Sequence, residues 1–271
     1  MRVDSRENLN IPPFGYAIDY MTFGGMYREV YVQVRNKTHL ADVFVKPQIH
    51  PLQVTTEITV QNISDGITLQ QEIRKKGEGA YSPLGQKPVK QTNVQIVFPV
   101  QEICLWEPEN PHLYEIRTSL WKNGKMIDAR VDITGFREAG FRKDGFYLNG
   151  KKLRLRGLNR HQSYPYVGYA APASMQIFDA DILKKELGVN AVRTSHYPQS
   201  QDFIRRCDEI GLLVFTEFPG WQHIGDEEWK RQAVQNLKEM IVQYRNHPSI
   251  ILWGVRINES QDDDVFYRET N

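Results

Sequence analysis

Cysteine is scarce in this chain of 271 residues, which contains only two, Cys104 and Cys207. Their wide separation and apolar surroundings predict two buried thiols rather than a disulfide framework or a zinc site. The chain also has no strong excess of one charge. It contains 34 Lys and Arg residues and 33 Asp and Glu residues, which gives a net charge of +1. Without a basic run that could follow a phosphate backbone, we expect no nucleic-acid partner.

Long hydrophobic runs are absent as well. The mean hydropathy is −0.53, and no apolar run approaches the roughly 20 residues needed to cross a bilayer. Residues 1–10 are polar and charged, without the apolar segment of a secretory signal peptide. We therefore expect a soluble, cytoplasmic chain with no membrane partner.

Several motifs with known chemistry are missing. The sequence has no glycine-rich phosphate loop, no Gly-x-Ser-x-Gly elbow and no His-Glu-x-x-His helix. The acidic run 262–264 lacks the alternating spacing and the glycine of a calcium loop, so we interpret it as a solvated face. Phosphate, serine-nucleophile and metal chemistry therefore fit the sequence poorly.

Between residues 30 and 150, apolar residues mostly alternate with polar ones, and Gly, Pro, Asn and Asp separate the runs. This period of two predicts short antiparallel strands. Asn123-Gly124 stands between two runs and supplies the positive φ of a tight hairpin turn. About seven strands at this spacing predict a β-sandwich of immunoglobulin type. The clearest runs are 40–46, 54–62, 68–74, 92–99, 113–121 and 127–133.

After residue 150, short apolar strands alternate with helical patterns, which predicts a parallel sheet, either open or closed into a barrel. An eight-fold barrel takes about 250 residues, and only four units are present here. At the other end, residues 11–34 hold about one strand pair. We interpret the chain as a piece of a larger protein. The strands are expected at 153–157, 191–195, 213–218 and 250–253, and the helices at 174–187, 201–210 and 227–245.

Polar side chains follow each of these strands. The strand at 250–253 is followed by Asn258 and Glu259, and residues at the carboxyl ends of barrel strands build active sites. Glu259 is therefore a candidate catalytic carboxylate. The alternative is that it caps a turn among the aspartates at 262–264.

The short apolar strand at 191–195 ends in polar groups, among them Arg193, His196 and Tyr197. Such a set suits a sugar, whose hydroxyls need many fixed donors and acceptors. The alternative is that Arg193 and His196 are satisfied core groups bonded to carboxylates. Two further strand ends contribute polar groups to the same rim, which makes coincidence a poor explanation. These groups are Asn159, Arg160, His161 and Glu217.

Two long motifs resemble glycoside hydrolase family 2, most closely its β-galactosidases. One is Asn190-x-x-Arg193-Thr-Ser-His196-Tyr-Pro, followed by Asp208-x-x-Gly211, and the other is Asn246-His-Pro-Ser, followed by an apolar strand and Asn258-Glu259. Residues 105–114 resemble the immunoglobulin-like domain of the family, and Asp19 with residues 24–28 resembles the end of its jelly roll.

The resemblance implies three domains. Residues 1–35 would be the end of a jelly-roll sugar-binding domain, residues 36–140 an immunoglobulin-like β-sandwich, and residues 141–271 the first half of a catalytic TIM (β/α)8 barrel. The overall class is thus multidomain, β and then α/β.

The resemblance also implies hydrolysis of terminal β-D-galactosides with retention of configuration, through two carboxylates about 5–5.5 Å apart. By similarity, Glu259 would be the acid/base and Asn258 would bond the sugar 2-hydroxyl. His161 and His196 would contact the sugar, and Arg193 would position the nucleophile. Asp19 would bind sugar hydroxyls, and a sodium ion beside it is the one candidate cofactor.

The chain departs from the family pattern in two respects. The nucleophile of the family lies on a later strand, so we expect this chain alone to be inactive, with the remainder of a parent chain as its partner. A homo-oligomer of that parent stays open. Trp221 stands where many members place a glutamate that binds magnesium with a histidine, here His223, which puts that magnesium in doubt.

Two other functions stay open. The chain could be a non-catalytic module that binds carbohydrate or complements a missing half, because it lacks the nucleophile. Within the enzyme class, β-glucuronidase and β-mannosidase share the motifs around His196 and Glu259.

Overall fold

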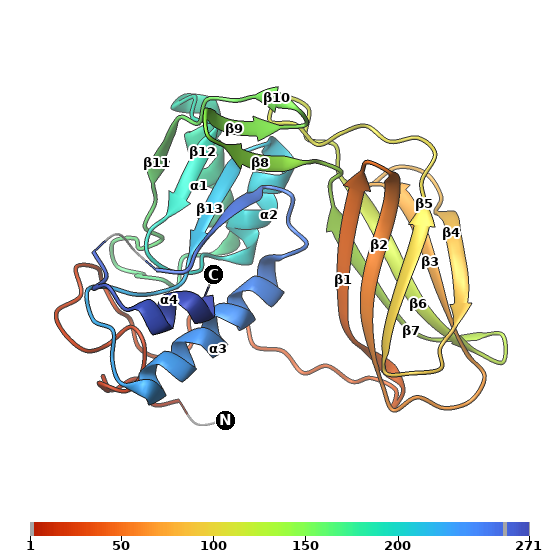
Figure 1. The fold of residues 1–271 in the computed structure, drawn as a ribbon, viewed down its shortest axis with the longest axis horizontal. Coiled ribbons are helices and arrows are strands. Elements are labelled where there is room, and N and C mark those ends of the chain that lie inside the picture. Colours follow the sequence, from red (N-terminus) through yellow and green to blue (C-terminus); the bar gives the residue numbers. More distant parts are fainter. Residues whose placement is uncertain (1–2, 257–258, 271) are drawn as a thin grey trace. The chain divides into compact units, whose positions relative to one another are not determined.

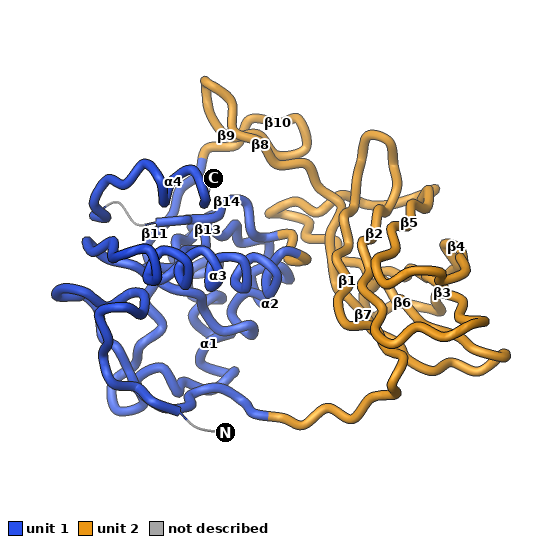
Figure 2. The backbone as a smooth tube through the Cα atoms, turned by 60° about the horizontal axis from the view of Figure 1, so that its bottom comes forward, with its two compact units in different colours: residues 1–30, 155–245, 249–271 blue, residues 31–154, 246–248 orange. Residues whose placement is uncertain are grey.

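The computed structural model describes residues 3–256 and 259–270. They form two compact units, which Figure 2 distinguishes by colour. Unit 1 takes its described residues from Met1–Val30, Leu155–Arg245 and Ser249–Asn271. Unit 2 comprises Tyr31–Arg154 and Asn246–Pro248.

Unit 2 contains the predicted β-sandwich, built from two antiparallel sheets (Figure 1). Its core is formed by the inward-facing residues of both sheets, among them the fully buried Val54, Leu69 and Ile116. One sheet has the order β1 (His39–Ile49), β2 (Leu52–Gln61), β5 (Asn93–Pro99). The other has the order β4 (Ser82–Pro88), β3 (Ile67–Lys75), β6 (Tyr114–Lys122), β7 (Lys125–Thr134).

The predicted hairpin joins β6 to β7. Asn123 has φ 50° and Gly124 has φ 72°, the left-handed pair that a two-residue turn between twisted strands requires. Lys122 pairs with Lys125 across this turn. The hairpin prediction is confirmed.

Three features of unit 2 differ from expectation. Strand β4 was not predicted, because its side chains are exposed or half-buried and so show no apolar alternation. A small antiparallel sheet of β8 (Ala139–Arg142), β9 (Gly145–Leu148) and β10 (Lys151–Lys152) was also not predicted. The prediction that Cys104 is buried is wrong, because this residue is exposed. In this irregular segment the buried side chain is that of Trp106.

Asn246, the first residue of the second motif, belongs to unit 2. Its side-chain oxygen accepts a hydrogen bond from the Val45 backbone at 3.0 Å. Its amide nitrogen donates to the Val43 carbonyl at 3.1 Å and to Asp132 Oδ1 at 3.0 Å. This motif asparagine therefore bonds to β1 and β7.

Unit 1 contains the predicted parallel sheet. Its strand order is β11 (Gly157–Asn159), β12 (Ala191–Thr194), β13 (Leu213–Glu217), β14 (Ile250–Gly254), and neighbouring strands are parallel. The helices are α1 (Ala173–Asp181), extended by the π-helix η1 (Ile182–Glu186), α2 (Gln201–Ile210), α3 (Glu227–Tyr244) and α4 (Asp264–Thr270). A closed barrel stays a prediction.

Local capping explains where these helices begin and end. Ser200 Oγ accepts from the Asp202 backbone at 3.2 Å at the start of α2, and Gly211 ends this helix with φ 71°. Asp226 accepts from the Trp229 backbone at 3.0 Å at the start of α3. Side-chain acceptors at helix starts and glycine after helix ends satisfy groups that the helix leaves open.

One expectation for unit 1 was wrong. The strand predicted at 153–157 begins only at Gly157, where a Cβ atom would lie 2.5 Å from the Ala191 carbonyl oxygen. The acidic run 262–264 is mostly exposed, as expected, since only Asp263 is half-buried. It also leads into α4, because Asp263 accepts from the Phe266 backbone at 2.8 Å and lies 2.7 Å from Lys230 Nζ.

The N-terminal segment within residues 3–30 packs in unit 1 and forms no strand, so the strand pair expected within 11–34 is not present. Strands require a neighbour for their backbone hydrogen bonds. This segment instead contacts α3, where Trp229 Nε1 donates to the Phe14 carbonyl, and the loop after β13, where the Tyr20 hydroxyl donates to the Gly220 carbonyl. Whether it ends a jelly roll stays a prediction.

None of the helices in the described part of the chain has the length and apolar character of a membrane-spanning helix.

Candidate active site

The carboxyl ends of the four parallel strands lie at one edge of the sheet of unit 1 (Figure 1). The register aligns Asn159 with Arg193 and Glu217 with Gly254. Parallel strands end on the same side, so polar residues that are distant in sequence meet there. Arg193 and Glu217, two of the strand-end residues singled out from the sequence, therefore lie at this edge.

Arg193 and His196 both bind Glu217, the last residue of β13. Arg193 Nε donates to Glu217 Oε1, and His196 Nδ1 lies 3.0 Å from Glu217 Oε2. The Glu217 side chain is 0% exposed, whereas those of Arg193 and His196 are 25% and 12% exposed. The alternative that both groups are bonded to a carboxylate thus holds, yet each still reaches solvent.

An aromatic cluster surrounds the two histidines. The His161 and His196 ring centroids are 5.5 Å apart. The Tyr20 ring lies 6.4 Å from that of His161 and 6.0 Å from that of His196. Tyr197 and Trp221 complete the cluster, at 5.3 Å and 6.2 Å from Tyr20. The predicted sugar-contacting histidines therefore do lie together.

The electrostatics of the cluster favour neutral rings. Partial burial and the neighbouring His196 lower the pKa of His161, and Asp19 opposes this shift. Burial, with Tyr197 and Glu217 nearby, raises the pKa of Tyr20. Both groups are therefore neutral near pH 7, so they present hydrogen-bonding atoms without charge.

Asp19 and Tyr20 come from the N-terminal segment, which is held to unit 1 by hydrogen bonds. The Tyr20 hydroxyl donates to the Gly220 carbonyl at 3.3 Å. Arg28 donates to Gln162 Oε1 at 2.8 Å, and the Tyr169 hydroxyl donates to the Met21 carbonyl. Asp19 itself is exposed.

Two motif residues follow β14. Asn258 lies outside the described residues, and Glu259 is exposed. The segment that follows Glu259 is tied to the loop after β13, because Ser260 Oγ donates to the Trp221 carbonyl at 2.9 Å and the Gln261 backbone donates to the Gln222 carbonyl at 3.1 Å. This brings the Glu259 segment beside the loop whose Trp221 ring lies 5.5 Å from that of His196.

The residues at the magnesium position do not suit that ion. Trp221 offers an indole where a carboxylate oxygen is needed. The His223 ring packs against Tyr16 at 5.1 Å and Trp229 at 5.9 Å, and a Cβ atom on Gly15 would lie 1.9 Å from it. No cluster of three or more His, Cys, Asp or Glu suited to a metal occurs in the described part of the chain. We therefore assign no step to magnesium.

Two further charged residues named in the sequence analysis, Arg160 and Asp208, make structural contacts. Arg160 is buried, donates to Asp179 Oδ2 at 2.8 Å and to Gln176 at 2.8 Å, and lies over the Phe203 ring at 4.1 Å. Asp208 of the first motif accepts from the Ser249 backbone at 3.0 Å, just before β14. Arg160 thus links the residue after β11 to α1, and Asp208 links α2 to the residue before β14.

Tyr20 is a member of this aromatic cluster that the sequence analysis missed. It adjoins Asp19 in the sequence, and this adjacency was the only available signal. Its contacts with the histidines depend on the path of the N-terminal segment, which no local pattern encodes.

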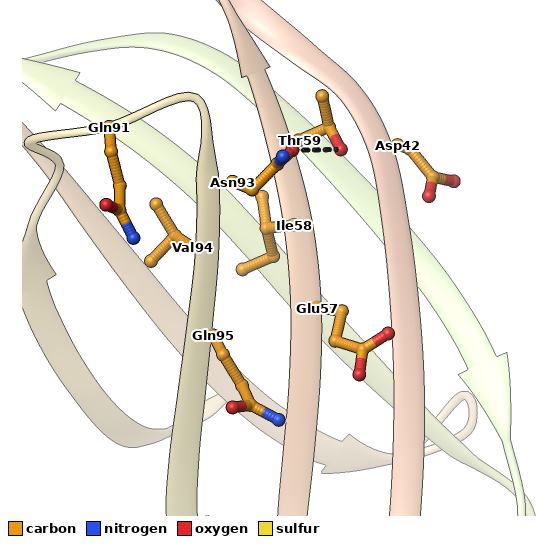
Figure 3. Close-up of a pocket in the computed structure, with 8 residues that line it drawn as sticks. All are labelled: Asp42, Glu57, Ile58, Thr59, Gln91, Asn93, Val94 and Gln95. Atoms are coloured by element: carbon orange, nitrogen blue, oxygen red, sulfur yellow. Dashed lines mark hydrogen bonds between the residues drawn. The ribbon is translucent and has the colours of Figure 1, made fainter.

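A separate hollow of about 360 Å³ lies on unit 2 (Figure 3). Thr59 donates to Asn93 at 3.2 Å within it. Its lining is mostly polar and contains none of the described site residues. The lining residues are Asp42, Glu57, Ile58, Thr59, Gln91, Asn93, Val94 and Gln95.

Known proteins resemble the chain along almost its whole length. A β-galactosidase of Thermoanaerobacter pseudethanolicus is 49% identical, over 100% of this chain and 37% of the relative. A β-galactosidase of Thermoanaerobacterium thermosulfurigenes is also 49% identical, over 99% of this chain and 39% of the relative. A β-glucuronidase structure from Bacteroides uniformis matches 97% of this chain and 34% of its own, with a TM-score of 0.83 and 28% identity.

The chain thus spans well under half the length of these relatives. Two sequence profiles describe it further: "Glycosyl hydrolases family 2" matches residues 38–137, and "Glycosyl hydrolases family 2, TIM barrel domain" matches residues 140–269. Together with the strand-end site, these matches show that the chain belongs to glycoside hydrolase family 2.

Proposed function

We propose that this chain contributes to the hydrolysis of terminal β-D-galactosides with retention of configuration, as part of a longer enzyme. The observation that carries the proposal is the meeting of Arg193, His161 and His196 with Tyr20 at one sheet edge. The 49% identity to two β-galactosidases supports galactose as the sugar.

In the proposed mechanism Glu259 is the acid/base. Its carboxyl group protonates the leaving oxygen, and its carboxylate later takes a proton from the attacking water. His161, His196 and Asp19 contact sugar hydroxyls, and Asn258 bonds the 2-hydroxyl. A sodium ion beside Asp19 stays part of this proposal, as does the cytoplasmic location.

The nucleophile is proposed to lie outside this chain, on the remainder of the parent. Glu217 is the carboxylate best placed among the strand ends, but it is buried and bound to both Arg193 and His196. A nucleophile must be able to reach the anomeric carbon. Because both oxygens of the buried Glu217 already bind Arg193 and His196, we propose that it positions these two residues instead. Arg193 would then position the external nucleophile.

The first test measures hydrolysis of a chromogenic β-galactoside by the 271-residue chain and by the longer parent. We expect no turnover by the chain alone. In the parent, Glu259→Gln should lower kcat by about 10²–10⁴-fold, the usual contribution of a general acid–base group. Glu228→Gln, an exposed glutamate on α3, is the matched control.

Two results would contradict the proposal. Turnover by the chain alone that Glu259→Gln abolishes would place a nucleophile within these residues. Full activity of the parent with Glu259→Gln would remove Glu259 from the acid/base role.

The second candidate is β-glucuronidase activity, which the similarity to the Bacteroides uniformis enzyme favours. Chromogenic β-glucuronide and β-mannoside, assayed in parallel, decide between the sugars. If every glycoside is left intact by the parent while galactose still binds, a non-catalytic carbohydrate-binding module is the better description.

A further inference from the structure

We propose that Glu217 is a positioning residue, which sets the tautomer of His196 and orients the guanidinium of Arg193. Both side chains would then contact a glycoside with a fixed arrangement of hydrogen-bond donors and acceptors. The role in glycoside binding depends on the function proposed above. The effect on the tautomer does not, because it follows from contacts within unit 1.

The two carboxylate oxygens of Glu217 serve different partners. Oε1 accepts from Arg193 Nε, and Oε2 lies 3.0 Å from His196 Nδ1. The side chain is 0% exposed, so water cannot take the place of either partner. A buried carboxylate that lost a partner would carry an uncompensated charge, which makes this arrangement costly to disturb.

The contact with His196 determines where its proton resides. An ionised carboxylate can only accept hydrogen bonds, so an Nδ1···Oε2 distance of 3.0 Å requires a proton on Nδ1. Arg193 Nη2 also approaches Nδ1, but at 3.5 Å this contact is at the limit of a hydrogen bond. Neutral His196 is therefore the Nδ1–H tautomer.

This tautomer makes Nε2 an acceptor. A hydroxyl of a bound sugar can then donate to Nε2, whereas the other tautomer would present an N–H there. The His196 ring is also held by Trp221 at 5.5 Å and Tyr20 at 6.0 Å. Glu217 thus selects the polarity of the ring while the aromatic side chains fix its place.

An amide at position 217 should reverse this selection. Guanidinium groups only donate, so the oxygen of a glutamine would turn toward Arg193. The amide N–H would then face His196 Nδ1, which could accept this hydrogen bond only through its lone pair, that is, without a proton on Nδ1. The proton would move to Nε2, although the side chain keeps its size.

The experiment records long-range ¹⁵N–¹H correlations of the histidine rings in the 271-residue chain, at a pH of about 8.5, where ordinary imidazoles are neutral. We expect His196 to carry its proton on Nδ1 in the unmodified chain and on Nε2 in Glu217→Gln. The His196 signal is identified by its loss in His196→Gln. Glu228→Gln should leave every histidine unchanged.

Two outcomes would overturn the proposal: an Nε2–H tautomer of His196 in the unmodified chain, or the same tautomer with and without the Glu217→Gln substitution. If that variant does not fold, the unmodified chain alone still decides, because only the Nδ1–H form agrees with the proposal. A merely structural Glu217 would change stability without reversing a tautomer.

The same substitution in the longer parent tests the functional part separately. We expect kcat/KM for a β-galactoside to fall at least tenfold, and Glu217→Asp, which keeps the charge, to recover part of the loss. A reversed tautomer with unchanged kcat/KM would reject the positioning role and leave the proposed hydrolysis intact. A parent without glycosidase activity would reject the proposed function but not the tautomer assignment.

Discussion

Glu217 and Gly254 are paired neighbours across β13 and β14, and a Cβ atom on Gly254 would lie 2.7 Å from Glu217 Cγ. The glycine therefore provides the space that the buried carboxylate occupies. The last residue of β14 shapes the site without contributing a side chain.

Gly254→Ala should disturb this packing. The added methyl group would also lie 2.8 Å from Phe215 Cε2, so Glu217 or Phe215 must move, at a cost of about 1–3 kcal/mol for an overpacked core. Hydrogen exchange of β12 and β13 amides measures the loss within unit 1. Gly140→Ala, where nothing lies within 4 Å, is the control. Equal protection of these amides in both variants would show that the methyl group fits beside Glu217 without displacing it.

Asp19→Asn should lower the pKa of His161 further. Burial and His196 already hold this pKa below 6.5, and Asp19 is the group that raises it. An NMR titration of the His161 ring measures the change, with Asp4→Asn as the control for an exposed aspartate of the same segment. An unchanged His161 would mean that Asp19 does not face the histidines.

The same pKa shift predicts how acid affects unit 1. A histidine with a lowered folded-state pKa binds fewer protons than it does when unfolded. Its contribution to stability is therefore lost as the pH falls from 6.5 through the folded-state pKa. His161→Gln should remove this part of the acid sensitivity, as read from amide exchange in β11 and β12 across the pH range.

Tyr20→Ala should loosen the N-terminal segment. The substitution removes ring contacts with His161, His196, Tyr197 and Trp221, and we expect a cost of about 2–4 kcal/mol, below that of a fully buried aromatic residue. Tyr20→Phe loses only the 3.3 Å hydrogen bond to Gly220, worth about 0.5–1.5 kcal/mol. Proteolysis within residues 11–30 is a direct measurement. Tyr166→Ala, at a fully exposed ring, should change nothing.

Asp132→Asn should change the pH dependence of unit 2. Burial raises the pKa of Asp132 despite Arg130 and Asn246, and Asp42 adds to the effect. Between 3.8 and this raised pKa the folded state binds more protons, so stability falls as the pH rises through the window.

The variant lacks this titration, so its stability relative to the unmodified chain should increase as the pH rises through the same window. Hydrogen exchange of β1 and β7 amides checks this. Asp65→Asn, at an exposed aspartate between β2 and β3, provides the comparison. A constant difference at all pH values would refute the raised pKa.

Much of the secondary structure followed from sequence, because its causes are local. The positive φ angles of Asn123 and Gly124 suit a tight turn, and this preference belongs to the two residues themselves. In the same way, Ser200 and Gly211 mark the start and the end of the helix 201–210. Strand β4 escaped prediction because a mostly exposed strand carries no hydrophobic period. Its existence depends on pairing with β3.

The order of the amino acids is enough to show which residue types stand at the strand ends. Each of four polar residues follows an apolar run: Arg193, His196, Glu217 and Glu259. What each of these side chains contacts depends on the tertiary structure. Parallel pairing places Glu217 in the core between Arg193 and His196, whereas Glu259 remains exposed. The N-terminal segment brings Tyr20 to the same edge. Such meetings depend on long-range packing, which periodicity and propensity along the chain do not encode.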